Sequence, residues 1–186
     1  TTSFFAEYRV LGPPIGNAGK VDYTTNDLFS SIESTEGLVF DVFTNMVINS
    51  VDVFLNSDQP SNMTVYLNDR FGNLINSKTF NLPQGNISSP IRHTLILDFL
   101  VPHGEGYRLS SSSNYNLVVD INESGFPFSI GNLGSIVSGH EWNLTNKYFY
   151  FYNWNVNSIC TSSRSEIVAE VTNPPLLGIS QNNINL

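Results

Sequence analysis

Three histidines and sixteen acidic residues are the side chains with which this sequence could carry out catalysis or bind a metal. None of the histidines has the His-x-x-x-His spacing of a zinc site, and the sequence holds no Gly-x-Ser-x-Gly elbow or phosphate-binding Gly-rich loop. Glycoside hydrolysis needs two facing carboxylates, and the sequence singles out no such pair. The one cysteine, Cys160, cannot form an internal disulfide and is expected to be a small buried hydrophobe. These observations favour a protein that is not an enzyme.

The run Tyr148 to Trp154 is the sharpest feature of the sequence. On one continuous strand its tyrosines and Trp154 would share a face, while Phe149 and Phe151 would lie on the other face. The tyrosine and tryptophan face could stack on sugar rings. The alternative, which we prefer, is that both faces are buried, with each ring-tip polar group reaching a partner.

Two loop regions offer neutral hydrogen-bonding groups beside aromatic rings, a combination used in carbohydrate or protein recognition. They are Ser110 to Tyr115 and Asn122 to Phe128. The group His140-Glu141-Trp142 could add an imidazole, a carboxylate and an indole to one pocket, although an ordinary polar loop explains each segment too. The candidate ligand-binding residues are Tyr115, Asn122, Glu123, Phe126, His140, Trp142 and Trp154.

Acidic residues in predicted loops raise the alternative of a structural calcium ion, which takes oxygen ligands. Asp27, Glu33 and Glu36 are the candidate ligands. No Asp-x-Asp-x-Asp-Gly run accompanies them, so we expect no cofactor and keep calcium as the alternative.

Composition narrows the classes of partner. The net charge is −8, with only eight lysines and arginines, whereas nucleic acids and anionic membranes attract clusters of cations. No apolar run of about 18 residues could insert into a bilayer. The charged residues make up only 13 %, so asparagine and serine must supply much of the polar surface, which suits a protein outside the cell.

Alternation with period two recurs along the chain, and helical periodicity is almost absent. The pattern predicts an all-β fold, an antiparallel sandwich of the jelly-roll kind over residues 20–157. The clearest hairpin spans residues 63–80, with Gly72 in its turn. One short helical turn is expected at Asn26 to Ile32. The predicted strands are Leu38–Phe43, Val47–Leu55, Met63–Asn68, Leu74–Phe80, Arg92–Val101, Leu117–Ile121, Phe126–Ile130, Lys147–Val156 and Glu166–Val171.

At the two ends of the chain apolar and polar residues also alternate as in strands, but these segments are separated from the predicted sandwich. Residues 1–12 and 158–173 are predicted to pair with each other as a terminal hairpin, and residues 174–186 read as a linker to a further module.

Four stretches of the sequence resemble repeat modules of large Bacteroidota surface proteins, including gliding-motility adhesins exported by the type IX system. These stretches are GLVFDVFTNMVINSVDVFLNSDQPSNMTVYLNDRFGNLINSKTFNLPQG, LDFLVPHGEGYRLS, SGFPFSI and YFYFYNWNV. The flanks TTSFFAEYRV and SICTSSRSEIVAEVTN resemble the last two strands of Ig-like repeats in those proteins. The resemblance implies an extracellular, cell-surface module with neighbouring repeats in the same chain.

We therefore expect a non-enzymatic adhesin module that recognises a surface glycan or another cell-surface ligand through its sandwich loops. The alternatives are a structural spacer repeat and an accessory carbohydrate-binding domain of a secreted enzyme. Family resemblance alone does not decide among them, because one fold serves many functions.

Overall fold

A computed structural model describes residues 2–6, 8–24, 36–112, 117–162 and 165–169. These residues form strands, turns and bends without a helix, and therefore no helix that could cross a membrane. The chain divides into two compact units, one from residues 1–9 with 161–186 and the other from residues 10–160. The predicted helical turn at Asn26 to Ile32 lies outside the described residues.

The first unit contains the pairing of the two chain ends. Strand β1 (Thr2–Ala6) runs antiparallel to β15 (Ser165–Ala169), with Thr2 opposite Ala169. Within the same unit, the amide of Ser162 donates to the carbonyl of Tyr8 at 2.9 Å. The predicted pairing of the terminal strands is confirmed.

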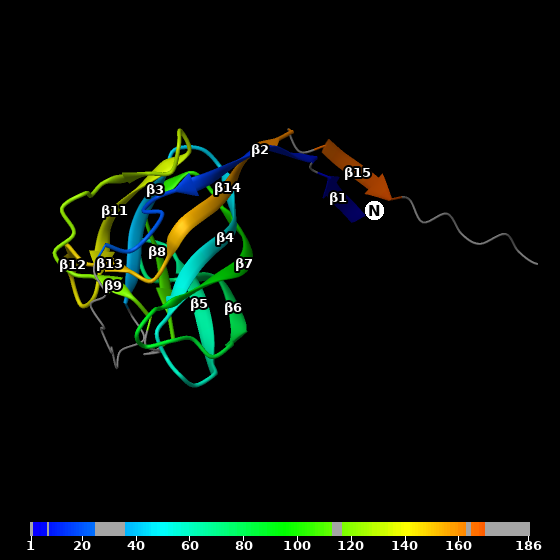
Figure 1. Cartoon of the computed structure of the whole chain (residues 1–186). Helices are drawn as coiled ribbons and strands as arrows, with labels where there is room; N and C mark the ends of the chain where they lie inside the picture. The colour runs from blue at the N-terminus through cyan, green and yellow to red at the C-terminus, as the bar shows by residue number, and fades with distance from the viewer. Residues whose placement is uncertain (1, 7, 25–35, 113–116, 163–164, 170–186) are drawn as a thin grey trace, which may run out of the picture. The chain divides into compact units, whose positions relative to one another are not determined.

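The second unit is a β-sandwich (Figure 1). Its larger sheet has the strand order β10-β11-β3-β8-β5-β6, with β12 paired to β11. Every neighbouring pair in this sheet runs antiparallel. The strands are β3 (Gly37–Val42), β5 (Ser61–Asn68), β6 (Leu74–Leu82), β8 (Gly104–Ser111), β10 (Phe128–Ser129), β11 (Gly134–His140) and β12 (Leu144–Thr145).

The facing sheet has the order β2-β14-β4-β7, and Figure 1 shows β2 beside β14. A separate short pair joins β9 to β13. The strands are β2 (Arg9–Ala18), β4 (Met46–Leu55), β7 (Ile91–Val101), β9 (Val119–Asp120), β13 (Tyr148–Phe149) and β14 (Tyr152–Thr161).

The core lies between the two sheets and follows from alternation along the strands. On β5 the side chains of Met63, Val65 and Leu67 are buried while their neighbours are half-buried or exposed. The two sheets meet directly where the ring of Phe40 on β3 packs edge-on against Trp154 on β14, with centroids 5.2 Å apart. Because each strand presents one apolar face inward, stacking the sheets removes both faces from water.

The predicted hairpin is confirmed as β5 and β6, whose turn places Gly72 at φ 88°. Among the described residues, four strands were not predicted: β2, β8, β11 and β12. Strand β2 contains Pro13 and Pro14, which usually end a strand. It is an edge strand of its sheet, where a missing N–H is tolerated. The prediction of a buried Cys160 is wrong, since Cys160 is exposed and the preceding Ile159 is buried.

The aromatic run does not form one continuous strand. It is split between β13 and β14, and Tyr150 and Asn153 adopt positive φ values of 54° and 46°. Every aromatic side chain from Tyr148 to Trp154 is buried. The interpretation of the run as core is confirmed, although the predicted division into two strand faces is wrong because the backbone turns at Tyr150.

Candidate functional site

A buried ionic cluster centres on Lys20, directly after β2. Gly19 takes φ 69°, a left-handed conformation that glycine adopts without strain, and this turns the chain into the sandwich. The Lys20 amide donates to the Tyr148 hydroxyl at 3.1 Å, while the Lys20 carbonyl accepts from the Asn153 amide at 2.8 Å. The backbone of Lys20 is therefore fixed on both sides.

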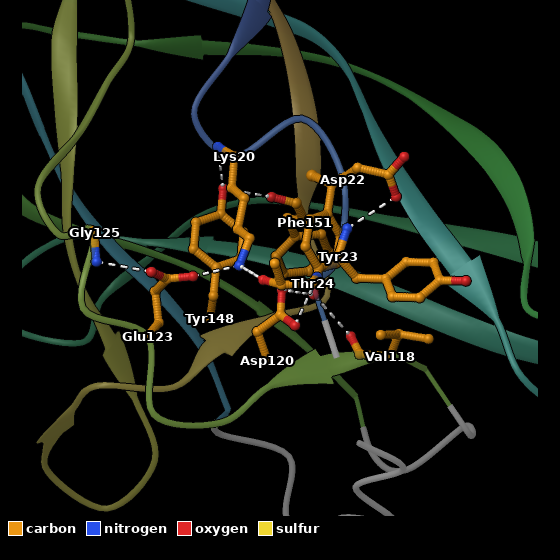
Figure 2. A network of polar contacts seen from close by, with 11 residues as sticks. Lys20, Asp22, Tyr23, Thr24, Val118, Asp120, Glu123, Gly125, Tyr148 and Phe151 are labelled. Carbon is orange, nitrogen blue, oxygen red and sulfur yellow. Dashed lines mark hydrogen bonds and ion pairs between the residues drawn. The ribbon is translucent and has the colours of Figure 1, made fainter. Parts of the chain in front are cut away.

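The ammonium of Lys20 contacts two carboxylates (Figure 2). Its Nζ lies 2.6 Å from Asp120 Oδ2 and also donates to Glu123 Oε2. A third bond of 2.6 Å reaches the Thr24 hydroxyl. The Lys20, Asp120 and Glu123 side chains are 11 %, 2 % and 12 % exposed, so the cluster is largely removed from water.

Asp120 is held from several directions. Its Oδ1 accepts from the Thr24 amide at 2.9 Å, and its Oδ2 lies 3.4 Å from the Tyr152 hydroxyl. Burial raises the pKa of the Tyr148 and Tyr152 hydroxyls, and the nearby carboxylates raise both further. Both tyrosines therefore keep their protons at neutral pH and remain hydrogen-bond donors.

Glu123 joins this cluster to a surface pocket of about 410 Å³. One Glu123 oxygen accepts from Lys20 and the other accepts from the Gly125 amide at 2.7 Å, so both oxygens are engaged. The Glu123 amide also donates to the carbonyl of Asn146, which ties the loop after β9 to the segment after β12. The pocket is lined by Glu123, Ser124, Phe126, Val137, Ser138, Leu144, Thr145 and Asn146.

An aromatic stack fixes one wall of the pocket. The ring of Phe126 stacks on Tyr148 with centroids 5.8 Å apart and an interplanar angle of 18°. It also meets Phe128 edge-on at 5.3 Å. Since Tyr148 is fully buried, Phe126 is backed by the core and presents a preformed apolar surface.

A polar group in the same pocket lacks a hydrogen bond. The hydroxyl oxygen of Ser138 is buried, and no partner for it lies among the described residues. Buried polar atoms nearly always have a partner, so an unsatisfied hydroxyl beside a pocket calls for an explanation. The oxygen itself is closed to solvent, so a ligand in the pocket would reach it only after the Ser138 side chain rearranged.

The β11–β12 hairpin carries two exposed apolar side chains, Trp142 in its turn and Leu144 at the start of β12, and Leu144 lines the pocket. Trp142 is 67 % exposed and Leu144 is 68 % exposed. The turn is held by the Glu141 amide, which donates to the Asn143 carbonyl at 3.0 Å, and by an ion pair of 2.7 Å between Glu141 and Lys147. A solvent-facing indole on an ordered turn is available for stacking.

The structure therefore brings together some of the predicted ligand-binding residues. Glu123 and Phe126 line the pocket, and Trp142 follows His140 in the turn that borders it. His140 is half-buried at the end of β11, and Asn122 is exposed at φ 60° directly before Glu123. Tyr115 lies outside the described residues.

Trp154 does not belong to this group. Its side chain is fully buried, and its indole N–H donates to the carbonyl of Phe151 at 2.8 Å. It offers no surface to an outside ligand in this structure, because the polar tip is satisfied within the core.

The predicted calcium ligands are not assembled where the structure describes them. Glu36 is 2 % exposed and accepts from the Tyr150 hydroxyl at 2.5 Å, while Asp27 and Glu33 lie outside the described residues. Within the described ranges no group of three or more histidine, cysteine, aspartate or glutamate side chains could hold a metal ion.

Lys20 was not singled out by the sequence, because a lone lysine in a polar stretch carries no pattern of its own. Its partners stand about 100 residues away, and only the pairing of strands brings them together. Comparison with family models and with curated proteins finds no match to this chain.

Proposed function

We propose that the sandwich is a non-enzymatic recognition module of an extracellular surface protein. It would bind a carbohydrate at the pocket between the loop after β9 and the β11–β12 hairpin. The observation that carries the proposal is a pocket that combines an aromatic wall with neutral hydrogen-bonding groups and is lined in part by the β11–β12 hairpin, whose turn carries the exposed indole of Trp142.

Carbohydrate fits the chemistry of this surface. The C–H face of a sugar ring is apolar and stacks on a flat aromatic ring, while the hydroxyls around its edge need donors and acceptors. Phe126 and Trp142 supply the rings, whereas Thr145 and Asn146 supply a hydroxyl and an amide group. A few polar groups placed around an apolar surface fix the orientation of a bound ligand.

The carboxylate at the pocket supports binding over turnover. Both Glu123 oxygens are engaged, one by Lys20 and the other by the Gly125 amide. A general acid or base must reach the reacting group through a free oxygen. Glu123 is thus better placed to hold the loop than to act on a bound sugar.

A glycan array probed with the whole chain tests the proposal. We expect reproducible binding to at least one oligosaccharide class, and a loss of at least tenfold in affinity for Trp142→Ala. The matched control is Phe71→Ala, because Phe71 is 77 % exposed but lies in the turn between β5 and β6, outside the pocket. Equal losses for both variants would refute the assignment of this site.

The adhesin role depends on the resemblance to surface repeats and is part of the same proposal. If the wild-type chain binds no glycan on a broad array, the structural spacer is favoured instead. Cleavage of any polysaccharide by the whole chain would overturn both functions and indicate a hydrolase.

A further inference from the structure

The contact between Lys20 and Asp120 holds an amine next to a carboxyl carbon in a largely buried site. The amine nitrogen lies 2.6 Å from Asp120 Oδ2, which places it within about 3.8 Å of the carboxyl carbon once a C–O length is added. Reacting atoms held roughly 3–3.5 Å apart are near the attack distance, so a small shift suffices. Both side chains are also nearly removed from water.

We propose that Lys20 and Asp120 join spontaneously in an intramolecular isopeptide bond. The neutral amine of Lys20 attacks the carboxyl carbon of Asp120, a C–N bond forms, and one C–O bond breaks. The ammonium loses two protons in total, and these leave with one carboxylate oxygen as a single water molecule. The reaction needs no oxidant, reductant or other co-reactant.

Glu123 is the proton carrier for this step. Its Oε2 accepts from Lys20 Nζ, so it can take the proton that the amine must lose before attack and return it to the leaving oxygen. Its other oxygen is fixed by the Gly125 amide, and the carboxylate is thereby aimed at the amine.

Two donors face the charge that develops on Asp120. The Thr24 amide lies 2.9 Å from Oδ1 and would stabilise the oxyanion formed when nitrogen adds to the carbon. The Tyr152 hydroxyl lies 3.4 Å from Oδ2, the oxygen beside the amine, and can hydrogen-bond to it as it leaves. Burial keeps Tyr152 protonated, which preserves this donor.

The surroundings favour a neutral product over separated ions. Lys20 Nζ lies 5.9 Å from the ring centroid of Tyr148, which is fully buried, so aromatic surface takes the place of water on that side. Buried ions cost more desolvation free energy than a buried amide does. The cluster holds one lysine and two carboxylates, so forming the amide leaves a single charge, on Glu123.

Asp120, not Glu123, is the carboxylate that is attacked, because it is the more buried acid and has two hydrogen-bond donors other than lysine. The chain also contains a matched exposed pair, Lys147 and Glu141, at 2.7 Å. Their side chains are 23 % and 26 % exposed, so water solvates both ions, and we expect no bond there.

The bond would fasten the edge strand β2 to the interior of the sandwich. Lys20 lies two residues after β2, and Asp120 lies on β9. Strands β2 and β14 are neighbours, so a force on the chain ends would peel these two apart once β1 and β15 had separated. A covalent link at Lys20 would stop the peeling at that point and would restrict the unfolded chain.

Intact-mass spectrometry of the full chain tests the proposal. We expect the wild-type mass to fall below the sequence value by one water molecule, and fragmentation to yield a branched peptide joining Lys20 to Asp120. Lys20→Arg should restore the full mass. Asp120→Asn should lose ammonia in place of water, because the amine would then displace an amide nitrogen.

Two further variants separate chemistry from folding. Glu123→Gln should keep the circular dichroism spectrum of the sandwich yet show the full mass, since the proton carrier is gone. Lys147→Arg should still lose one water molecule. A folded wild-type chain at its full sequence mass would overturn the proposal, and so would a branched peptide that ends on Glu123 or retention of the water loss in Lys20→Arg. These outcomes are independent of glycan binding.

Discussion

Replacing Trp154 with phenylalanine should weaken the sandwich more than any exposed aromatic substitution. The indole is fully buried, donates to the Phe151 carbonyl at 2.8 Å and packs against Phe40. Phenylalanine removes three ring atoms, which costs about 2 kcal/mol of burial, with partial relaxation of the cavity. The lost hydrogen bond adds about 1 kcal/mol. The Phe151 carbonyl still accepts from Tyr148 at 3.1 Å, so no buried acceptor is left alone.

The total is a loss of about 3 kcal/mol in the free energy of unfolding, or roughly 6–12 °C in melting temperature for a chain of this size. Urea unfolding followed by circular dichroism measures the loss without relying on tryptophan fluorescence. Trp142→Phe is the matched control, because Trp142 is 67 % exposed, and we expect a change within about 0.5 kcal/mol. A Trp154→Phe variant as stable as the control would refute the placement of this indole in the core.

Two other perturbations follow from the same packing. Because burial raises the pKa of Tyr148 and Tyr152, unfolded chains release these protons near pH 10 while folded chains retain them. The free energy of unfolding therefore keeps its full value below about pH 10 and should fall above it by about 1.4 kcal/mol per pH unit for each tyrosine. A urea midpoint that does not fall as the pH rises from about 9 to about 11 would contradict this expectation. Gly139→Ala would drive a methyl group into the Lys147 carbonyl and should lower the free energy of unfolding, measured in urea, by about 1–3 kcal/mol. In the control Gly16→Ala the new methyl group meets only an ordinary contact at 3.8 Å, so the free energy of unfolding should change by less than about 0.5 kcal/mol. Equal losses for the two glycines would show that the close approach at Gly139 is not as placed.

The fold class could be predicted from sequence because buried faces impose a period of two. The apolar residues Met63, Val65 and Leu67 stand at every second position, and this alternation predicts their strand. Strand β8 was missed because its first residues, Gly104 to Gly106, have the composition of a turn. Gly104 nevertheless pairs with Val42 on β3, and an irregularity with Gly106 at φ 69° precedes the regular pairing from Tyr107 onward. Tertiary pairing overrides local preference in such segments.

The aromatic run shows where strand periodicity fails. Alternation assumes an uninterrupted strand, but positive φ values at Tyr150 and Asn153 redirect the side chains, and both sets of rings enter the core. Asparagine adopts a positive φ more readily than most residues, but tyrosine seldom does, so the residue type at Tyr150 gives no signal of the turn.

The candidate site was predicted in part. Phe126 and Trp142 stood out because aromatic residues beside Gly, Pro, Ser and Asn suggest ordered loops with exposed rings. Lys20 could not be found this way, because a lysine becomes unusual only when the fold buries it against Asp120 and Glu123.

The recognition function is tested most directly by the two indole N–H resonances of a ¹⁵N-labelled chain, which has only two tryptophans. Trp142 is exposed on the turn beside the pocket, whereas Trp154 is buried and serves as an internal control. Titration with a panel of oligosaccharides should shift the Trp142 resonance in a saturable manner and leave Trp154 in place. A Trp142 resonance that stays unmoved by every oligosaccharide would contradict carbohydrate recognition at this pocket.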